Sequence, residues 1–183
     1  MTHITLAVTG SISAYKAADI TSQLGKLGYA VSVLMTEAAS HFITPLTLQV
    51  LSKNPVALDL MDEPRPDKVN HIEIGKETNL FLVAPATANT IAKLANGLAD
   101  NMVTATALAL PSHVKKVIAP AMNTKMYENP LTQHNLEILK KFGWEIMEPR
   151  EAILACGDHG TGALADVNII IEKVKEIINE KTI

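Results

Sequence analysis

Hydrophobic positions along the chain alternate between short β-branched runs and longer stretches in which apolar residues recur every three or four positions. The short runs predict strands at residues 4–8, 30–35, 56–58, 80–84, 116–119 and 144–147. The longer stretches predict helices at about residues 14–27, 45–51, 85–94, 101–110 and 131–142, and from residue 168 onwards. This alternation indicates one α/β domain over residues 1–183, with a mostly parallel sheet between two layers of helices.

A few segments fit the alternation less well. Residues 59–69 hold two prolines and several charges, which is typical of a surface loop. Residues 71–74 alternate like a short strand at an edge, and a small helical stretch after Thr36 includes Phe42. Residues 155–163 contain three glycines and predict an irregular loop that cannot belong to a packed strand.

Composition limits the classes of function. With 183 residues, 48% of them hydrophobic and 19% charged, the chain is globular. A net charge of -3 offers no electrostatic footprint for nucleic acid or an anionic membrane. No apolar run approaches the roughly 20 residues that span a bilayer, and no signal peptide is visible. The single cysteine fits a reducing cytoplasm. The six histidines show no HExxH spacing, so the sequence argues against a metal site.

Small, hydroxyl-bearing and amide residues gather just after four predicted strands, at residues 10–13, 36, 85–90 and 121–123. The carboxyl ends of parallel strands meet at one edge of a sheet, where such folds bind ligands. Gly10 permits a tight turn, and Ser11 and Ser13 can cap a helix or meet a phosphate. The loop is not GxGxxG, which favours one phosphate over a pyrophosphate. Simple helix capping explains each hydroxyl equally well when it is taken alone.

The stretch at residues 119–130 joins a predicted strand to a predicted helix. A strand followed by proline, a polar loop and a helix is an ordinary α/β connection. This one also holds Met122, Asn123 and Met126, and an exposed loop seldom presents so much apolar surface without covering something. The stretch therefore predicts one wall of a ligand site.

Four motifs together resemble the flavin-dependent cysteine decarboxylases, and the likeness covers nearly the whole chain. They are residues 10–16 (GSISAYK), 85–90 (PATANT), 120–126 (PAMNTKM) and 155–160 (ACGDHG). The Pro-x-Met-Asn-x-x-Met block is specific to this family. The resemblance implies a three-layer α/β/α Rossmann-like (flavodoxin-like) fold and a homotrimer, in some members a dodecamer, with FMN near a subunit interface.

The resemblance also implies the reaction, which is decarboxylation of 4'-phosphopantothenoylcysteine to 4'-phosphopantetheine in coenzyme A biosynthesis. A cysteine carboxylate has no electron sink for the charge left by CO2. Oxidation by the flavin would convert the carbon–sulfur bond into a thioaldehyde, which is such a sink. After CO2 is lost, the resulting enethiol would be reduced again and the flavin would end unchanged.

Carried over by position, three residues acquire catalytic or substrate roles. His71 matches the active-site histidine, a base or an electrostatic partner of the reacting groups. Asn123 matches the residue that holds the substrate carboxylate, which an amide does without a counter-charge that would disfavour CO2 loss. Cys156 matches the proton donor to the enethiol. From the residues alone, a structural histidine, a loop-capping asparagine and a small buried thiol remain the alternatives.

The remaining site residues follow from the same correspondence. Glycines around Cys156 suggest a mobile flap that closes over the substrate and excludes water. Further substrate contacts are expected from Met126, Ala155 and Gly157. Cofactor contacts are expected from Gly10, Ser11, Ile12, Ser13, Thr36, Phe42, Thr87, Ala88, Asn89, Thr90, Ala121 and Met122.

The sequence departs from the family pattern at two positions. Tyr127 stands where the family usually has Trp, and Ala163 follows Gly162 where the family usually has Arg. Lys125 and Arg150 are the cations considered as replacements for that arginine. In many bacteria the decarboxylase is fused to the synthetase that makes its substrate, and we expect that synthetase to be a separate protein here because the chain ends at Ile183.

Three alternative functions remain. A peptidyl-cysteine decarboxylase of lantibiotic maturation stops at the enethiol and does not need Cys156. Prenyl-flavin synthase relatives bind FMN but lack the combination of His71 with the 120–126 motif. Non-enzymatic FMN-binding regulatory homologues of protein phosphatases tend to have acidic tails and to lose catalytic residues, whereas this chain keeps the set.

Overall fold

A computed structural model describes residues 1–183 except 65, 158 and 181–183. Its central sheet contains six parallel strands in the order β3-β2-β1-β4-β5-β6. The strands are β1 (His3–Val8), β2 (Ala30–Met35), β3 (Val56–Ala57), β4 (Leu80–Ala86), β5 (Lys115–Pro120) and β6 (Trp144–Ile146). This arrangement confirms the predicted three-layer Rossmann-like α/β fold.

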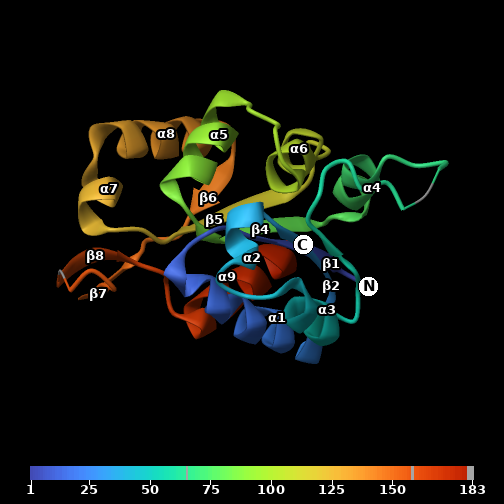
Figure 1. Ribbon diagram of the computed structural model, residues 1–183, viewed down its shortest axis with the longest axis horizontal. Helices are drawn as coiled ribbons and strands as arrows, with labels where there is room; N and C mark the ends of the chain where they lie inside the picture. Colours follow the sequence, from blue (N-terminus) through green and yellow to red (C-terminus); the bar gives the residue numbers. More distant parts are fainter. Residues whose placement is uncertain (65, 158, 181–183) are drawn as a thin grey trace.

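Helices cover both faces of the sheet (Figure 1). One face packs against α1 (Lys16–Lys26), α3 (Pro45–Ser52) and α9 (Val167–Asn179). The other face packs against α4 (Asn70–Glu77), α5 (Ala88–Asn96), α6 (Met102–Leu108) and α8 (Pro130–Lys141). Shorter pieces are the 3-10 helix η1 (Ile12–Tyr15), α2 (Glu37–Ser40), α7 (Thr124–Glu128) and the hairpin strands β7 (Arg150–Ile153) and β8 (His159–Ala163). Among the described residues, no helix combines the length and apolar character needed to cross a bilayer.

Alternate residues of each central strand face opposite sides of the sheet, so they belong in turn to two hydrophobic cores, one on each face. In β4, Leu80 and Leu82 belong to the cluster that contacts α1 and α9, whereas Phe81 and Val83 belong to the cluster that contacts α5 and α8. All seven residues of β4 are buried, which explains why the sequence shows a continuous apolar run there rather than alternation. Burying each large side chain stabilises the folded state by about 1.5–3 kcal/mol, so β4 makes a large contribution to the stability of both cores.

The strand order reverses between β1 and β4, so the loops that follow these strands diverge and leave a crevice between them. Buried Thr9 fixes the two loops relative to each other. Its hydroxyl donates to the Pro85 carbonyl oxygen at 2.7 Å and accepts from the Thr87 backbone N–H at 3.0 Å. The ligand-binding edge is therefore held by a buried hydrogen-bonded bridge.

The prediction of a strand at residues 71–74 is wrong, because these residues lie in α4. Four alternating residues do not distinguish a strand from one turn of helix. In the helix, the Glu73 carboxylate lies 2.7 Å from the ammonium groups of both Lys68 and Lys76. Their hydrogen bonds, Lys68 first, lower the pKa of Glu73 to about 2.

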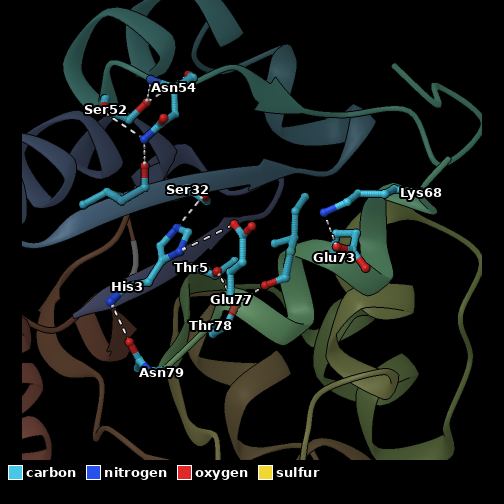
Figure 2. A network of polar contacts seen from close by, with 12 residues as sticks. His3, Thr5, Ser32, Ser52, Asn54, Lys68, Glu73, Glu77, Thr78 and Asn79 are labelled. Atoms are coloured by element: carbon cyan, nitrogen blue, oxygen red, sulfur yellow. Dashed lines mark hydrogen bonds and ion pairs between the residues drawn. The ribbon is translucent and has the colours of Figure 1, made fainter. Parts of the chain in front are cut away.

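A polar network joins the end of α4 to the amino end of β1 (Figure 2). The Thr5 and Thr78 hydroxyls share a buried hydrogen bond of 2.6 Å. The His3 backbone N–H donates to Asn79 Oδ1 at 2.8 Å, and the Asn79 N–H donates to the His3 carbonyl at 2.9 Å. Glu77 lies 3.9 Å from the His3 ring. These contacts fix where α4 ends, and hence where the histidine in its first turn lies.

The prediction of an irregular loop at residues 155–163 is also wrong, since residues 159–163 form β8 and pair antiparallel with β7. Two glycines permit this hairpin to lie directly on the loop after β5. A Cβ at Gly162 would collide with the Met122 carbonyl oxygen, and one at Gly160 would lie 2.6 Å from Thr124 Oγ1. The Met122 N–H donates to the Gly162 carbonyl at 2.9 Å. Close backbone approach, rather than irregularity, accounts for these glycines.

Smaller differences concern where elements begin and end. Pro85 does not stop β4, which continues to Ala86. The first helix begins as a 3-10 turn, and Phe42 lies just beyond α2 rather than within it. The short helix α7 was not expected, because its five residues are too few to show a periodic pattern.

Candidate active site

A cavity of about 870 Å³ opens at the carboxyl edge of the sheet, and all four predicted loops line it. Its volume lies within the range of ordinary small-molecule sites. Most of the residues predicted from sequence lie on its wall. They are Gly10, Ser11, Ile12, Ser13, Thr36, Thr87, Ala88, Asn89, Thr90, Ala121, Met122, Asn123, Met126, Ala155 and Cys156.

The loop after β1 forms the first wall. Ser11 caps η1, and its hydroxyl accepts from the Ser13 N–H at 3.3 Å. Thr36 caps α2 by accepting from the Ala39 N–H at 3.3 Å. Gly10 packs so tightly that an added Cβ would lie 2.6 Å from the Ala38 Cβ. The capping interpretation therefore holds for both hydroxyls, while their residues also line the cavity.

The amino terminus of α5 forms the second wall. Thr87 caps this nine-residue helix, and its hydroxyl accepts from the Thr90 N–H at 3.2 Å. Residues 87–90 all line the cavity. The first-turn N–H groups of a helix have no partners within the helix, and the helix dipole makes this end positive. Together with Ser11 and Ser13, this wall suits one phosphate group.

Asn123 lies at the junction of the third wall and the hairpin. Its side-chain carbonyl caps α7 by accepting from the Lys125 N–H at 2.9 Å. Its amide nitrogen donates to Cys156 Sγ at 3.2 Å. Because the oxygen is held by the helix cap, the N–H groups are directed toward the thiol, so the capping role and the donor role occur in the same side chain.

The exposed Cys156 lies in the turn between β7 and β8. Gly157 closes this turn with φ of 88°, and its N–H donates to the Leu154 carbonyl at 2.8 Å. Gly157 does not line the cavity, although Ala155 and Cys156 do. Its left-handed conformation instead orients the two residues that precede it.

Tyr127 anchors the segment after β5 through two hydrogen bonds. Its hydroxyl donates to Glu148 Oε2 at 3.0 Å, and its carbonyl accepts from the Gln133 side chain at 2.6 Å. Burial, with help from the Glu148 carboxylate, raises the pKa of Tyr127 to about 12. Met126, its neighbour, lines the cavity and remains 49% exposed.

Sequence reasoning missed several charged and polar residues on the wall. Lys93 Nζ lies 2.5 Å from Asp100 Oδ2, and this hydrogen bond lowers the pKa of Asp100. Lys93 follows Asn89 by four positions and so shares its helix face, a signal that could have found it. The other wall residues outside the predicted set are Tyr15, Lys16, Glu37, Ala38, Asn101, Arg150, Ala152, Ile153, Leu154, Gly162, Ala163 and Leu164.

Besides Gly157, two predicted residues lie outside the cavity wall of their own chain. His71 is in the first turn of α4, which Figure 1 shows at the opposite end of the molecule from β7 and β8. Its Nδ1 atom is buried and has no hydrogen-bond partner among the described residues. Phe42 is 47% exposed and also lies outside the wall.

The wall offers hydroxyls, backbone N–H groups and one amide beside a thiol, a donor set suited to a phosphorylated organic ligand and a carboxylate. Within the described part of the chain, no three side chains of His, Cys, Asp or Glu gather as metal ligands would.

The family model described as Flavoprotein matches residues 1–179. A probable phosphopantothenoylcysteine decarboxylase of Streptococcus mutans is 62% identical over 173 residues, which cover 94% of this chain and 97% of that protein. A solved structure of a cysteine-to-serine mutant of PPC decarboxylase, complexed with pantothenoylaminoethenethiol, has a TM-score of 0.86 and 30% identity and covers 97% of this chain and 98% of that chain. The FMN-dependent cysteine decarboxylase SpaF has a TM-score of 0.83 at 30% identity, with 94% of each chain covered.

Longer relatives match as well. The bifunctional coenzyme A biosynthesis protein of Bacillus subtilis is 43% identical over 180 residues. This similarity covers 98% of the present chain but 44% of that longer protein.

Proposed function

The chain belongs to the flavoprotein family, and on that premise we propose that it catalyses the FMN-dependent decarboxylation of 4'-phosphopantothenoylcysteine to 4'-phosphopantetheine in coenzyme A biosynthesis. The observation that supports this proposal most is the contact between the Asn123 amide and the Cys156 thiol. Both residues line a cavity whose wall also offers donors for one phosphate group. A carboxylate-binding donor and a proton donor are the two groups that a cysteine substrate needs beside its reacting carbons.

FMN would be held by the loop after β1 and by the amino terminus of α5. The Ser11 and Ser13 loop and the first-turn N–H groups of α5 would take its phosphate, and Thr36, Ala121 and Met122 would contact the remainder. The close packing of Gly10 against Ala38 leaves no room for a side chain at this position, so it sets how closely the loop after β1 lies against α2. When bound, FMN would supply the reversible two-electron oxidation that gives the substrate an electron sink.

Asn123 would hold the substrate carboxylate through its amide N–H groups. An amide is neutral, so it orients the carboxylate without a counter-charge that would hold the negative charge on the carboxylate oxygens and disfavour its transfer to the substrate carbon as CO2 departs. Cys156 would then supply the proton from Sγ to the decarboxylated product. The hairpin that carries Cys156 would close this part of the cavity and exclude water.

We propose that His71 serves the site of a neighbouring subunit in a homotrimer, which some assemblies extend to a dodecamer. Its position outside the cavity of its own chain supports a contribution across an interface. Large apolar side chains are exposed near the cavity, which is typical of a protein surface that another subunit covers. They include Ile12, Tyr15 and Phe42, which are 58%, 60% and 47% exposed. The exposed Cys156 thiol suits a reducing compartment, so we also propose a cytoplasmic location.

The test is product analysis by mass spectrometry with two substrates, 4'-phosphopantothenoylcysteine and a peptide ending in cysteine. We expect the purified protein to be yellow and to convert the first substrate to 4'-phosphopantetheine. Conversion of the peptide to an enethiol with no turnover of the first substrate would replace the proposal with a peptidyl-cysteine decarboxylase. A colourless protein that FMN does not reconstitute would contradict the cofactor assignment.

A further inference from the structure

Arg150 and Ala163 are directly opposite each other on the two strands of the hairpin. Residues opposite each other in an antiparallel pair point to the same face, with Cβ atoms about 4.5–5.5 Å apart. Both residues line the cavity, so this shared face is the one turned toward the cavity. A guanidinium on Arg150 therefore reaches the region that a side chain at position 163 would occupy.

The Arg150 side chain is held in place by one edge of its guanidinium group. Its Nε donates to the buried Leu164 carbonyl at 3.1 Å and lies 3.2 Å from Asp166 Oδ1. Among the described residues, the hydrogen bond of this guanidinium is made by Nε and not by either terminal Nη group. An arginine carries five N–H donors in one plane, so fixing Nε orients the remaining donors for bidentate binding of an oxyanion.

Arg150 differs from the other cations of the cavity wall in its position and its charged partners. Among its described residues, the wall carries three cations, Lys16, Lys93 and Arg150, and two carboxylates, Glu37 and Asp100. The Lys93 ammonium is already paired with Asp100. Lys16 begins α1 directly after η1, on the wall assigned to the cofactor phosphate. Arg150 instead belongs to the hairpin that carries the reacting thiol.

We propose that Arg150 binds the phosphate of the substrate from β7, leaving the carboxylate to the neutral amide of Asn123. The inference rests on the proposed function and deepens it, because it assigns a residue for recognising the substrate. Arginine suits the task better than lysine, since its planar fork matches a phosphate or carboxylate with two parallel hydrogen bonds.

The main experiment compares Arg150→Gln with wild type on 4'-phosphopantothenoylcysteine and on the same molecule without its phosphate. We expect KM for the phosphorylated substrate to rise roughly ten- to hundredfold, in line with a charge-assisted bidentate contact, with FMN content unchanged. If the ligand is the phosphate, KM for the dephosphorylated substrate will not change. An equal rise in KM for both substrates would place Arg150 at a group that the two molecules share and would contradict the proposal. Unchanged kinetics with both substrates would overturn the proposal.

Transposing the arginine separates binding from hairpin architecture. The double variant Arg150→Ala with Ala163→Arg returns a guanidinium to the same face from the other strand, and we expect it to recover KM toward wild type. Asp166→Asn breaks the ion pair yet keeps the guanidinium, so its KM should stay near wild type. Equal defects in Asp166→Asn and Arg150→Gln, with no recovery in the double variant, would assign Arg150 a purely structural role. Lys141→Ala, which removes an exposed cation of α8 outside the cavity, is the matched control.

Calorimetric binding of 4'-phosphopantothenate and pantothenate distinguishes this inference from the proposed function, because neither molecule can react. Tighter binding of the phosphorylated form that disappears in Arg150→Gln would support Arg150 even if wild type failed to decarboxylate the cysteine substrate. Turnover by wild type together with unchanged kinetics and binding in Arg150→Gln would leave the function in place and reject the role of Arg150.

Discussion

At the scale of single residues, Asn123 combines two roles that sequence reasoning treated as competing explanations. Its oxygen caps α7 and its amide nitrogen faces Cys156. The cap prevents the amide from rotating, so the donor is already oriented before a substrate arrives. The helix cap would thus be part of the arrangement that we propose to bind the substrate carboxylate.

Replacing Asn123 by Asp tests this arrangement. Aspartate caps a helix as well as asparagine does, so we expect the free energy of unfolding to change by less than about 1 kcal/mol. The new carboxylate cannot donate and would repel the substrate, so turnover should fall roughly a hundredfold or more. Thermal unfolding and steady-state kinetics measure the two effects. Asn129→Asp, which alters the cap of α8 outside the cavity, is the control and should stay active. Full activity in Asn123→Asp would remove its assigned role.

At the scale of elements, the polar network that joins the end of α4 to the amino end of β1 makes the stability of the fold depend on pH. The His3 ring is largely buried, with its Nε2 2.8 Å from Ser32 Oγ, and burial lowers its pKa although Glu77 acts in the opposite direction. The folded protein therefore prefers neutral His3. As pH falls below about 6.5, the unfolded state takes up this proton first, so the contribution of His3 to stability is present above that pH and is lost below it.

We expect the melting temperature of wild type to fall more steeply between pH 7 and pH 5 than that of His3→Asn, which has no titrating ring. Glu77→Gln removes the charge that opposes the effect of burial, so its pH dependence should be steeper than in wild type. Differential scanning calorimetry across this pH range provides both slopes. Identical slopes in wild type and His3→Asn would show that His3 does not titrate differently on unfolding.

The hairpin depends on glycine at its contact with the loop after β5. Gly162→Ala should destabilise the protein by about 1–3 kcal/mol and displace β8, because the new Cβ meets the Met122 carbonyl. Displacement would move Cys156 from Asn123, so we also expect turnover to fall. Gly143→Ala is the matched control, since Gly143 also has a positive φ of 79° but has open space around its Cβ position. Equal losses in melting temperature and activity for the two variants would exclude a specific role for the docking contact.

At the scale of the whole molecule, the role proposed for His71 would make catalysis a property of the assembly, because this residue lies outside the cavity of its own chain. If His71 acts across an interface, a site needs His71 from one subunit and Cys156 from another. Subunits of His71→Asn and Cys156→Ser, each inactive in complete turnover, should then complement each other when mixed oligomers form.

Random assortment of equal amounts restores both groups in roughly a quarter of the sites of a cyclic oligomer. The measurement is 4'-phosphopantetheine formation after the two variants are dissociated and reassembled together, with light scattering to establish the oligomeric state. Each variant reassembled alone is the control and should remain inactive. No recovery in mixed oligomers would mean that both residues act from one chain or that His71 has another role.

The sequence by itself determined the order and type of the main elements, because long apolar periodicities such as those of β4 and α9 are local properties of the chain. It also predicted the loops that line the cavity, since the carboxyl ends of parallel strands must meet at one edge. Four residues at 71–74 and the glycines at 160 and 162 gave false signals, because short patterns fit more than one conformation.

Only the tertiary structure decided relations between residues that are distant in sequence. The pairing of Arg150 with Ala163, the approach of Gly162 to Met122 and the contact between Asn123 and Cys156 all depend on how the hairpin docks. His71 lies outside the cavity because α4 is fixed at the other end of the molecule by long-range hydrogen bonds to β1. Such contacts depend on register and packing between elements, which the periodicity of any single segment does not encode.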